Sequence, residues 1–261
     1  MSFETIRIAT DDRGIATLTL AWPERHNALS AAMIAELSEA AFALGTDPTV
    51  RVVVLAAEGE SFCAGADLGW MKEQFAASRA QRIEEARRLA QMLNALYTLP
   101  KPLIGRVQGQ AFGGGIGLIS VCDVAIAANG ARFALTETRL GLIPATIGPY
   151  VVARIGHAGA RRVFMSGRIF GAAEAAALGL LHAVVNAEQL DAAIELEVKP
   201  YLSTAPGAVA AAKDLLHTLG PSIDDAVIEA TIARLADIWE TSEAREGVAA
   251  FFDKRPPHWR K

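Results

Sequence analysis

The chain has 261 residues, of which 52% are hydrophobic, and it carries a formal net charge of −4 with a pI near 5.8. This composition supports a sizeable core and excludes a disordered chain, and the acidic balance argues against nucleic acid or an anionic membrane as a partner. The first residues lack the pattern of a secretory signal, no apolar run is long enough to span a membrane, and Cys63 and Cys122 form neither a disulfide framework nor a metal-ligand spacing. We therefore expect a soluble cytoplasmic protein without a metal centre, a nucleic-acid partner or a membrane partner.

The first quarter of the chain predicts strands and one helix. Residues 5–10 alternate between apolar and polar side chains, and residues 15–22 do the same. Ser30 is expected to cap a helix whose apolar residues recur at helical spacing as far as Leu44. The continuous apolar run 51–57 is typical of a strand that is buried on both faces.

The middle of the chain shows the order strand, loop, helix twice. The strand at 51–57 leads into the glycine-rich loop 58–69 and then into a long charged helix over about 70–99. A second buried strand, 102–108, leads into a second glycine-rich loop, 110–118, and a short apolar helix. Both loops therefore connect a buried strand to a helix.

The pattern changes toward the C-terminus. Two short strands are expected at 124–128 and 131–137, and from Gly148 onward the pattern is helical almost to the end. The fold class is therefore α/β over the first half of the chain, followed by a helical C-terminal third. One apolar stripe of that third packs either within the chain or against another subunit: Ile223, Val227, Ile228, Ile232 and Leu235.

Several common catalytic motifs are missing from the sequence. There is no G-x-S-x-G elbow, no phosphate-binding G-x-x-x-x-G-K-[ST] loop and no dinucleotide-binding G-x-G-x-x-G fingerprint. The five histidines have no metal-ligand spacing, and a single loop histidine such as His26 is more often structural than catalytic. The sequence therefore favours neither a metalloenzyme nor a Ser-His hydrolase.

The two glycine-rich loops are the strongest candidates for a ligand site. Both follow a predicted buried strand, and loops at the carboxyl ends of neighbouring strands lie on the same side of a sheet. Their small residues let a ligand approach main-chain N–H groups, and each loop leads into a helix whose first N–H groups are unpaired and partly positive. Two such groups from opposite sides would form an oxyanion hole for a thioester or ester carbonyl, whereas each loop taken alone is equally well explained as a tight turn.

Glu137 is the third candidate, in the segment ARFALTETRLGLIP. By the period of two it continues the face of Phe133 and Leu135 on the predicted strand 131–137. A carboxylate in that position lies either at the solvated end of the strand or in a low-dielectric site, where its pKa would rise and suit proton transfer near neutral pH. Without further context the solvated end is the simpler interpretation.

Five segments in order resemble the crotonase (enoyl-CoA hydratase/isomerase) superfamily: WPERHNALS, FCAGADL, GRVQGQAFGGGIGL, CDVAIAA and FALTETRLGLIP. The match runs from about residue 15 to residue 185, and the C-terminal FFDKRPPHW resembles the tail of the same family. The resemblance implies a crotonase-like spiral of ββα units in residues 1–195, and a helical region in 196–261 through which subunits form a homotrimer or a dimer of trimers. It also implies an acyl-CoA thioester as substrate, with no cofactor beyond the coenzyme A that the substrate carries.

The same resemblance assigns roles by position within the motifs. The N–H groups of Ala66 and Gly114 would form the oxyanion hole. The coenzyme A contacts would come from the first loop, from the residue after Asn27 and from the C-terminal tail: Ala64 through its carbonyl, Ala66, Asp67, Leu68, Ala28, Phe251 and Lys254. The two tail residues would reach coenzyme A either in their own subunit or in a neighbouring one. Asp67 is also predicted to be the N-cap of the following helix, which is the role we favour.

Two positions depart from the family's pattern. Hydratases with two catalytic glutamates carry one of them where this chain has Gly117, so that carboxylate is absent here. The second glutamate matches Glu137, which thereby becomes the principal catalytic candidate. Gly69 stands where many members have a basic residue, for which Lys72 is a candidate substitute.

The resemblance as a whole predicts reversible hydration of a 2,3-enoyl-CoA. The segment FCAGADLGWMKE, together with Gly117 in the second loop, is most similar to bacterial hydratases of branched, carboxylated enoyl-CoAs such as 3-methylglutaconyl-CoA. Arg139 is a candidate partner for a distal carboxylate, with a surface ion pair as the simpler interpretation. The alternatives are a crotonase-fold isomerase that moves a double bond with one carboxylate, and an acyl-CoA-binding protein without activity, against which the presence of Glu137 argues.

Overall fold

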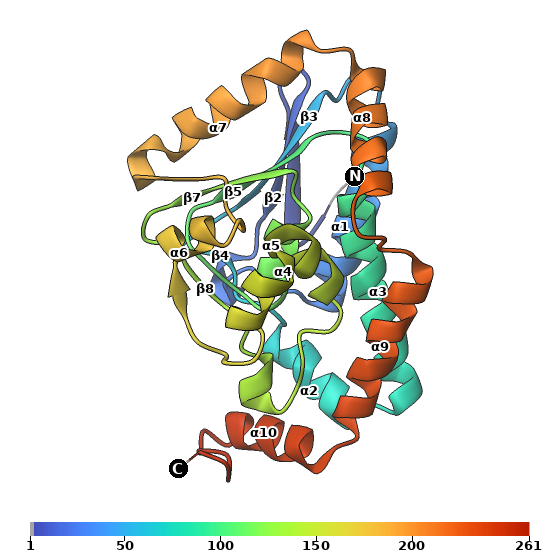
Figure 1. Ribbon diagram of the computed structural model, residues 1–261, viewed down its shortest axis with the longest axis vertical. Helices are drawn as coiled ribbons and strands as arrows, with labels where there is room; N and C mark the ends of the chain where they lie inside the picture. Colours follow the sequence, from blue (N-terminus) through green and yellow to red (C-terminus); the bar gives the residue numbers. More distant parts are fainter. Residues whose placement is uncertain (1–2, 261) are drawn as a thin grey trace.

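The protein, seen in a computed structural model that describes residues 3–260, is built around two β-sheets (Figure 1). The larger sheet has the strand order β1-β2-β3-β5-β7-β10, in which β1 pairs antiparallel with β2 and each later pair is parallel. Its strands are β1 (Ile6–Thr10), β2 (Ile15–Leu20), β3 (Val52–Ala57), β5 (Leu103–Val107), β7 (Val124–Ala128) and β10 (Ala183–Val185). The smaller sheet has the order β4-β6-β8-β9 and consists of β4 (Ser61–Cys63), β6 (Gln110–Phe112), β8 (Arg132–Ala134) and β9 (Phe170–Gly171).

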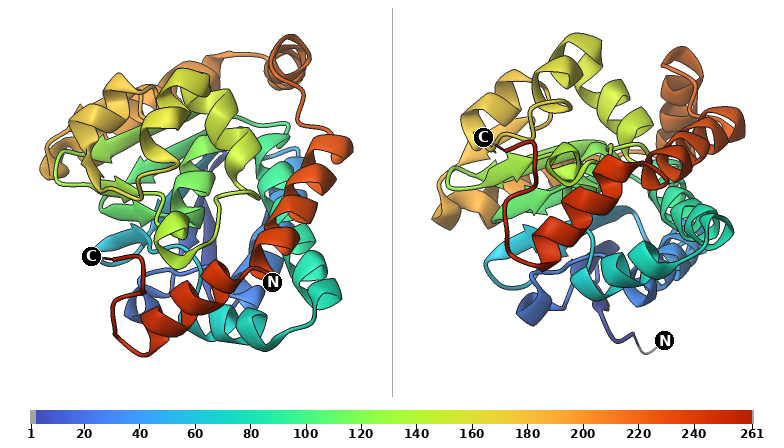
Figure 2. Two further views of the ribbon diagram at one scale, coloured as in Figure 1. Left: turned by 60° about the horizontal axis from the view of Figure 1, so that its bottom comes forward. Right: turned by 90° about the horizontal axis from the view of Figure 1, so that it is seen from below.

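Helices cover both sheets. The α-helices of residues 3–260 are α1 (Ala31–Thr46), α2 (Leu68–Ala76), α3 (Arg79–Tyr97), α4 (Gly114–Ser120), α5 (Gly148–Val163), α6 (Ala172–Ala177), α7 (Leu190–Val198), α8 (Pro206–Leu219), α9 (Asp225–Trp239) and α10 (Ser242–Phe252). Short 3₁₀ helices lie between them: η1 (Pro23–Arg25), η2 (Glu137–Leu140), η3 (Ala187–Gln189) and η4 (Lys199–Ser203). The C-terminal helices, red in Figure 2, pack against earlier parts of the chain: α9 contacts α3, and α10 contacts η2.

Three consecutive ββα units give the fold its spiral repeat. The first strands of these units, β3, β5 and β7, lie side by side in the larger sheet, and the second strands, β4, β6 and β8, lie side by side in the smaller sheet. The helices that complete the units are α2 with α3, then α4, then η2 with α5. The predicted α/β spiral is therefore confirmed, while the boundary at residue 195 and the oligomerising role of the C-terminal region stay predictions.

The larger sheet is buried on both faces. Val53 and Leu55 of β3 belong to the main core, together with apolar residues of α1 and α3. Val52 and Val54 point to the opposite face, where they pack beneath α7 with residues such as Ile194. A strand between two helical layers has no solvated face, which explains its continuous apolar run and confirms the strand predicted there.

Three predicted regions differ in the structure. The helix predicted over 70–99 is two helices, because Ala77 has an extended conformation and Ser78 caps α3 in a capping box with Gln81. The two glycine-rich loops contain the short strands β4 and β6, each too short for its sequence to show a period. The C-terminal third is not wholly helical, since it contributes β9 and β10 to the two sheets.

The apolar stripe of α9 packs within the chain. Ile228 and Ile232 are buried against Ala86 and Ala90 of α3, and Leu235 packs at the edge of the same cluster. Intramolecular packing therefore accounts for Ile228, Ile232 and Leu235 of this stripe, whereas the half-buried Val227 belongs to none of the core clusters among the described residues. No helix within residues 3–260 is both long and apolar enough to cross a membrane.

A buried ion pair joins α8 to the larger sheet. Lys213 is 8% exposed, and its Nζ donates to Asp123 Oδ2 at 2.8 Å and to the carbonyl oxygen of Lys101 at 3.1 Å. The same Asp123 oxygen accepts the N–H of Leu103 at 2.7 Å. The ammonium group therefore neutralises a carboxylate that lies beside the first residue of β5.

We expect Lys213→Met to lower the free energy of unfolding by about 2–4 kcal/mol, because it leaves the partly buried Asp123 carboxylate without its cation. Chemical denaturation at neutral pH measures this change. Lys199→Met, at an exposed lysine of η4, is the control and should change stability by less than about 0.5 kcal/mol. A loss for Lys213→Met no larger than that of the control would contradict the stabilising role of the pair.

Candidate active site

Three adjacent strand ends deliver the parts of the candidate site. In the smaller sheet β4 pairs parallel with β6, and β6 pairs parallel with β8, so their carboxyl ends lie at the same edge. The loop after β4 carries Ala66, the turn after β6 carries Gly114, and the segment after β8 carries Glu137. Residues from three distant parts of the sequence therefore meet at one edge of the sheet.

Ala66 and Gly114 each present a free main-chain N–H at this edge. Leu29 forms a bridge with the first loop, in which its N–H donates to Gly65 at 2.7 Å and its carbonyl accepts from Asp67 at 3.0 Å, so the Ala66 N–H between them is left out. Gly114 is the first residue of α4, where an N–H has no partner within its helix. Neither N–H donates a hydrogen bond within residues 3–260, so both can bind a ligand oxygen.

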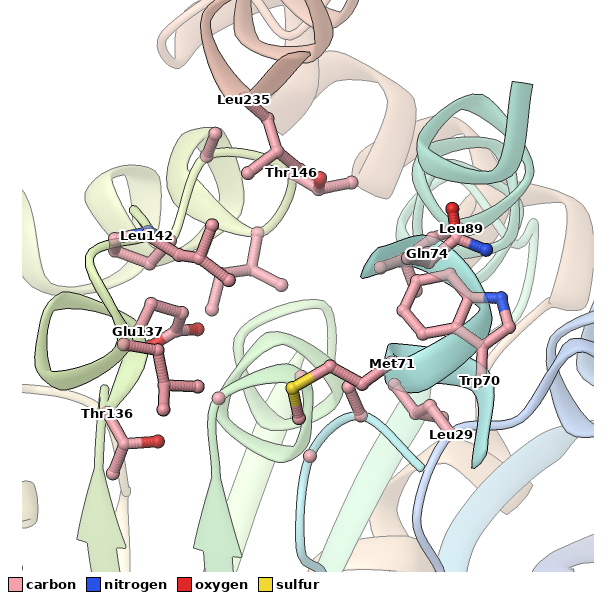
Figure 3. A pocket seen from close by; sticks show the side chains of 18 of the residues that line it. Leu29, Trp70, Met71, Gln74, Leu89, Thr136, Glu137, Leu142, Thr146 and Leu235 are labelled. Carbon is pink, nitrogen blue, oxygen red and sulfur yellow. The ribbon is translucent and has the colours of Figure 1, made fainter. Parts of the chain in front are cut away.

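A cavity of about 450 Å³ opens in front of these groups (Figure 3). Its wall combines the strand ends with α2, with α3, with η2 and the loop after it, and with the ends of α9 and α10. The lining residues are largely apolar: they include Leu29, Trp70, Met71, Leu89, Leu140, Leu142, Ile143, Ile147, Leu235, Trp239 and Phe251. Such a cavity suits an apolar acyl chain whose polar head meets the two N–H groups.

Glu137 lies in a different element from the one predicted. β8 ends at Ala134, and Glu137 is the first residue of η2 rather than part of a strand over 131–137. A methyl group in place of the Gly113 hydrogen would lie 3.2 Å from Glu137 Oε1, so the carboxylate sits directly beside the second loop. The strand predicted as far as residue 137 is therefore wrong. Of the two alternatives for the Glu137 carboxylate, the structure supports the low-dielectric site, because the chain turns into η2 and carries this side chain into the cavity wall.

Burial sets the protonation of Glu137. Its Oε2 is enclosed and has no hydrogen-bond partner within residues 3–260. Burial disfavours the charged form and raises the pKa of Glu137 from 4.5 to about 7, against a smaller opposing contribution from a backbone N–H. The carboxyl group is therefore poised to exchange a proton near neutral pH.

The raised pKa of Glu137 also predicts an effect on stability. Between the ordinary pKa of 4.5 and about 7, the unfolded chain loses a proton that the folded protein keeps. This group therefore has no cost below about pH 4.5 and its full cost, about 3 kcal/mol, above about pH 7. Glu137→Gln should accordingly stabilise the fold more at about pH 8 than at about pH 5, by about 2 kcal/mol in denaturation curves. The same stability difference from wild type at both pH values would contradict the burial of the charge.

The Ile147 side chain occupies the space beside Gly117. A methyl group in place of the Gly117 hydrogen would lie 2.5 Å from Ile147 Cγ2, so the space beside this position of α4 is already filled. Ile147 itself lines the cavity. Among the described residues that line the cavity, Glu137 is the only one with a carboxylate side chain.

The structure gathers most, but not all, of the predicted site residues. Those that line the cavity are Ala64, Ala66, Leu68, Gly114, Glu137, Arg139 and Phe251. Those that lie outside its lining are Ala28, Asp67, Lys72 and Lys254. Asp67 instead caps α2, since its Oδ1 accepts the N–H of Trp70 at 3.0 Å, which is the role favoured from the sequence.

The segment around His26 holds the first loop in place. The buried Asn27 side chain accepts the N–H of Trp22 at 2.9 Å and donates to the carbonyl oxygens of Glu58 and Ser61, each at 2.8 Å. His26 Nδ1 lies 3.0 Å from Ser61 Oγ. Both side chains therefore fix β4 and the loop that follows it.

Sequence reasoning missed one wall of the cavity. Trp70, Met71 and Gln74 project from α2, and Thr146 and Trp239 come from the loop before α5 and from α9. The signal for Gln74 was a polar residue on the otherwise apolar face of a short helix. Nothing in the sequence showed that α9 returns to meet α2, because that contact depends on the tertiary fold.

Comparisons with known proteins agree with this geometry. The family model for enoyl-CoA hydratase/isomerase matches residues 10–261. A crystal structure of an enoyl-CoA hydratase from Mycobacterium avium superposes with a TM-score of 0.85 at 33% identity, covering 98% of each chain. One from Shewanella pealeana superposes with a TM-score of 0.81 at 37% identity, covering 98% of this chain and 96% of that chain.

A curated human relative is the mitochondrial methylglutaconyl-CoA hydratase. It is 32% identical over an alignment of 263 positions, which covers 96% of this chain and 75% of the relative. The family model spans nearly the whole chain, and the fold follows the same spiral as the solved hydratases. The chain therefore belongs to the enoyl-CoA hydratase/isomerase family and is a crotonase-fold enzyme of the enoyl-CoA hydratase type.

Proposed function

We propose that this enzyme adds water reversibly across the 2,3 double bond of a branched, carboxylated enoyl-CoA such as 3-methylglutaconyl-CoA. The observation that carries the chemistry is the arrangement at the three strand ends. A single buried carboxyl group, Glu137, with a pKa of about 7 lies beside two unpaired N–H groups, at the head of an apolar cavity. An oxyanion hole with an adjacent proton carrier is what addition to a conjugated thioester requires.

In the proposed mechanism the N–H groups of Ala66 and Gly114 bind the thioester oxygen. They stabilise the enolate charge that develops there, and each such donor is worth about 3 kcal/mol. Ionised Glu137 removes a proton from water as the water oxygen bonds to C3. The protonated carboxyl group then delivers a proton to C2, so that one residue performs both transfers and ends in its starting state.

Coenzyme A would bind along the first loop and the C-terminal tail. The Ala64 carbonyl would accept from the adenine amino group, and Ala66 and Leu68 would contact coenzyme A from the cavity wall. Phe251 lines the cavity from α10, within the same chain. Ala28, Asp67 and Lys254 remain proposed contacts outside the cavity lining, and the exposed Lys254 suits a phosphate group.

Arg139 is the proposed partner for the distal carboxylate of the substrate. It lines the cavity and makes no ion pair within residues 3–260, so the simpler interpretation from the sequence finds no support there. Arg82, which also lines the cavity, is paired with Glu240 at 2.6 Å. The human relative named for methylglutaconyl-CoA adds support for a carboxylated substrate.

Oligomerisation into a trimer or a dimer of trimers also belongs to this proposal. Apolar side chains of α8 are exposed in the single chain: Leu215, Leu216 and Leu219 are 56%, 67% and 74% exposed. A subunit contact over α8 would cover them.

The test is turnover of crotonyl-CoA and of 3-methylglutaconyl-CoA, followed by the loss of the conjugated-thioester absorbance. We expect both to be hydrated, with the higher kcat/KM for 3-methylglutaconyl-CoA. Conversion of a 3-enoyl-CoA into its conjugated isomer, without hydration of either substrate, would show an isomerase and contradict the proposal. Equal kcat/KM values would contradict the carboxylated substrate alone.

A further inference from the structure

Two buried polar residues of the cavity wall have side chains without a hydrogen-bond partner among residues 3–260. Within residues 3–260 the buried polar and charged residues are Thr5, Asn27, Ser61, Gln74, Ser120, Thr146 and Lys213. The side chains of five have partners: Thr5 bonds Glu36, Asn27 the Glu58 carbonyl, Ser61 Gln110, Ser120 the Ile116 carbonyl and Lys213 Asp123. The two exceptions are Gln74 and Thr146, and both line the cavity. Outside the cavity, the half-buried Asn94 and Gln108 each also have an enclosed side-chain oxygen without a partner.

Thr146 is the more unusual of the two. The residue is 6% exposed, and its Oγ1 is enclosed without a hydrogen-bond partner. It stands in the loop before α5, next to Ile147 and Ala145 in the apolar lining. A valine would fill the same space without a hydroxyl to satisfy, so a threonine here implies a partner that is not part of the chain.

Gln74 presents a second neutral polar group from the opposite wall. It is 7% exposed, and its amide makes no hydrogen bond within residues 3–260, although its main-chain carbonyl accepts from Arg82. Figure 3 shows Gln74 beside Leu89 on the right of the cavity, Thr146 at the top and Glu137 on the left. Both residues therefore lie on parts of the cavity wall away from the catalytic carboxyl group.

The hydrogen-bond donors on this part of the wall are uncharged. Of the two arginines among the described residues that line the cavity, Arg82 is already engaged by Glu240 and by the carbonyl oxygens of Gln74 and Phe75. The threonine hydroxyl and the glutamine amide both donate hydrogen bonds. An oxygen acceptor on the acyl chain would satisfy them, whereas an alkyl chain would leave them unpaired.

We propose that Gln74 and Thr146 form a subsite for an oxygen acceptor on the acyl chain, a carbonyl or a carboxylate oxygen. The proposal rests on the proposed function in one respect, that the acyl-CoA occupies this cavity. The two residues then determine specificity, and they discriminate between acyl chains of equal length according to whether the chain carries the oxygen.

The test uses three 2-enoyl-CoA substrates of equal chain length that end in a methyl group, a ketone or a carboxylate. Thr146→Val and Gln74→Met keep the size of the side chain and remove the donor. We expect each to lower kcat/KM for at least one oxygenated substrate by about tenfold and to leave the methyl-terminated substrate unchanged or improved. The substrate that responds identifies the acceptor as a ketone or a carboxylate oxygen.

Thr218→Val, at an exposed threonine of α8, is the matched control and should change nothing. An equal loss on all three substrates, or no loss on any, would overturn the proposal. So would a carboxylated substrate that responds to Arg139→Gln while no substrate responds to Thr146→Val or Gln74→Met.

Binding of the corresponding saturated acyl-CoAs, measured by calorimetry, separates this proposal from the proposed function. Selective loss of affinity for the oxygenated ligand in Thr146→Val, in a protein that hydrates no substrate, would support the subsite and contradict the hydratase. Hydration without any discrimination in rate or binding would contradict the subsite alone.

Discussion

Glu137→Gln is expected to lower kcat by about 10²–10⁴-fold while KM changes little, because the substitution removes the proton carrier and keeps the shape of the side chain. Glu137 is the only carboxylate among the described residues that line the cavity, so no neighbouring acid can replace it. In the wild type, kcat/KM for hydration should rise with pH through about 7, since the carboxyl group must be ionised to accept a proton from water. That limb of the profile should be absent from Glu137→Gln.

Steady-state kinetics with a 2,3-enoyl-CoA measures both effects. Glu188→Gln, at an exposed glutamate of η3, serves as the control and should keep the wild-type rate and profile. Affinity for a saturated acyl-CoA should survive in Glu137→Gln, which shows that the cavity is intact. A folded Glu137→Gln protein with the wild-type kcat would remove this residue from the mechanism.

Gly247→Ala is expected to lower kcat by about 10–100-fold, because it displaces η2 and with it Glu137. α10 and η2 pack backbone against backbone: a methyl group on Gly247 would overlap the carbonyl carbon and oxygen of Leu140. On the other side, a methyl group on Gly141 would lie 2.5 Å from the carbonyl oxygen of Glu243. The two segments are too closely packed to admit another methyl group, so an added one must shift one of them.

Gly207→Ala is the matched control, since Gly207 is also a helical glycine and a methyl group there meets no atom within 4 Å among the described residues. We interpret Gly247 as a positioning residue that acts through Glu137. Its substitution should therefore lower kcat more than it raises KM. It should also change the pH at which kcat/KM rises, because that rise reflects ionisation of Glu137. A Gly247→Ala protein with lower stability but the wild-type kcat and pH profile would show a purely structural contact.

Local chemistry made much of the fold predictable. Ser30 caps α1 by accepting the N–H of Met33, as its position before the apolar spacing predicted. The run 51–57 became a strand with two buried faces, because a layered sheet leaves no solvated side. The loops around Ala66 and Gly114 meet because the strands before them pair in parallel.

Other features depend on contacts that a sequence does not display. β4 and β6 are too short to show a period, and the capping box at Ser78 was hidden within a continuous helical spacing. Glu137 was assigned to a strand because alternation continues past Ala134, although the chain there turns into η2. The sequence indicated that a glycine, Gly117, replaces a carboxylate of the two-glutamate hydratases. It did not indicate that Ile147 fills the space beside this glycine.

Hydration in oxygen-18-labelled water is the most direct test of a hydratase that works with a single carboxyl group. The 3-hydroxyacyl-CoA product should carry the label on the C3 oxygen, and Glu137→Gln should form this product at least about 10²-fold more slowly than the wild type. An unlabelled product with a shifted double bond, or labelled product formed equally fast by Glu137→Gln, would contradict it.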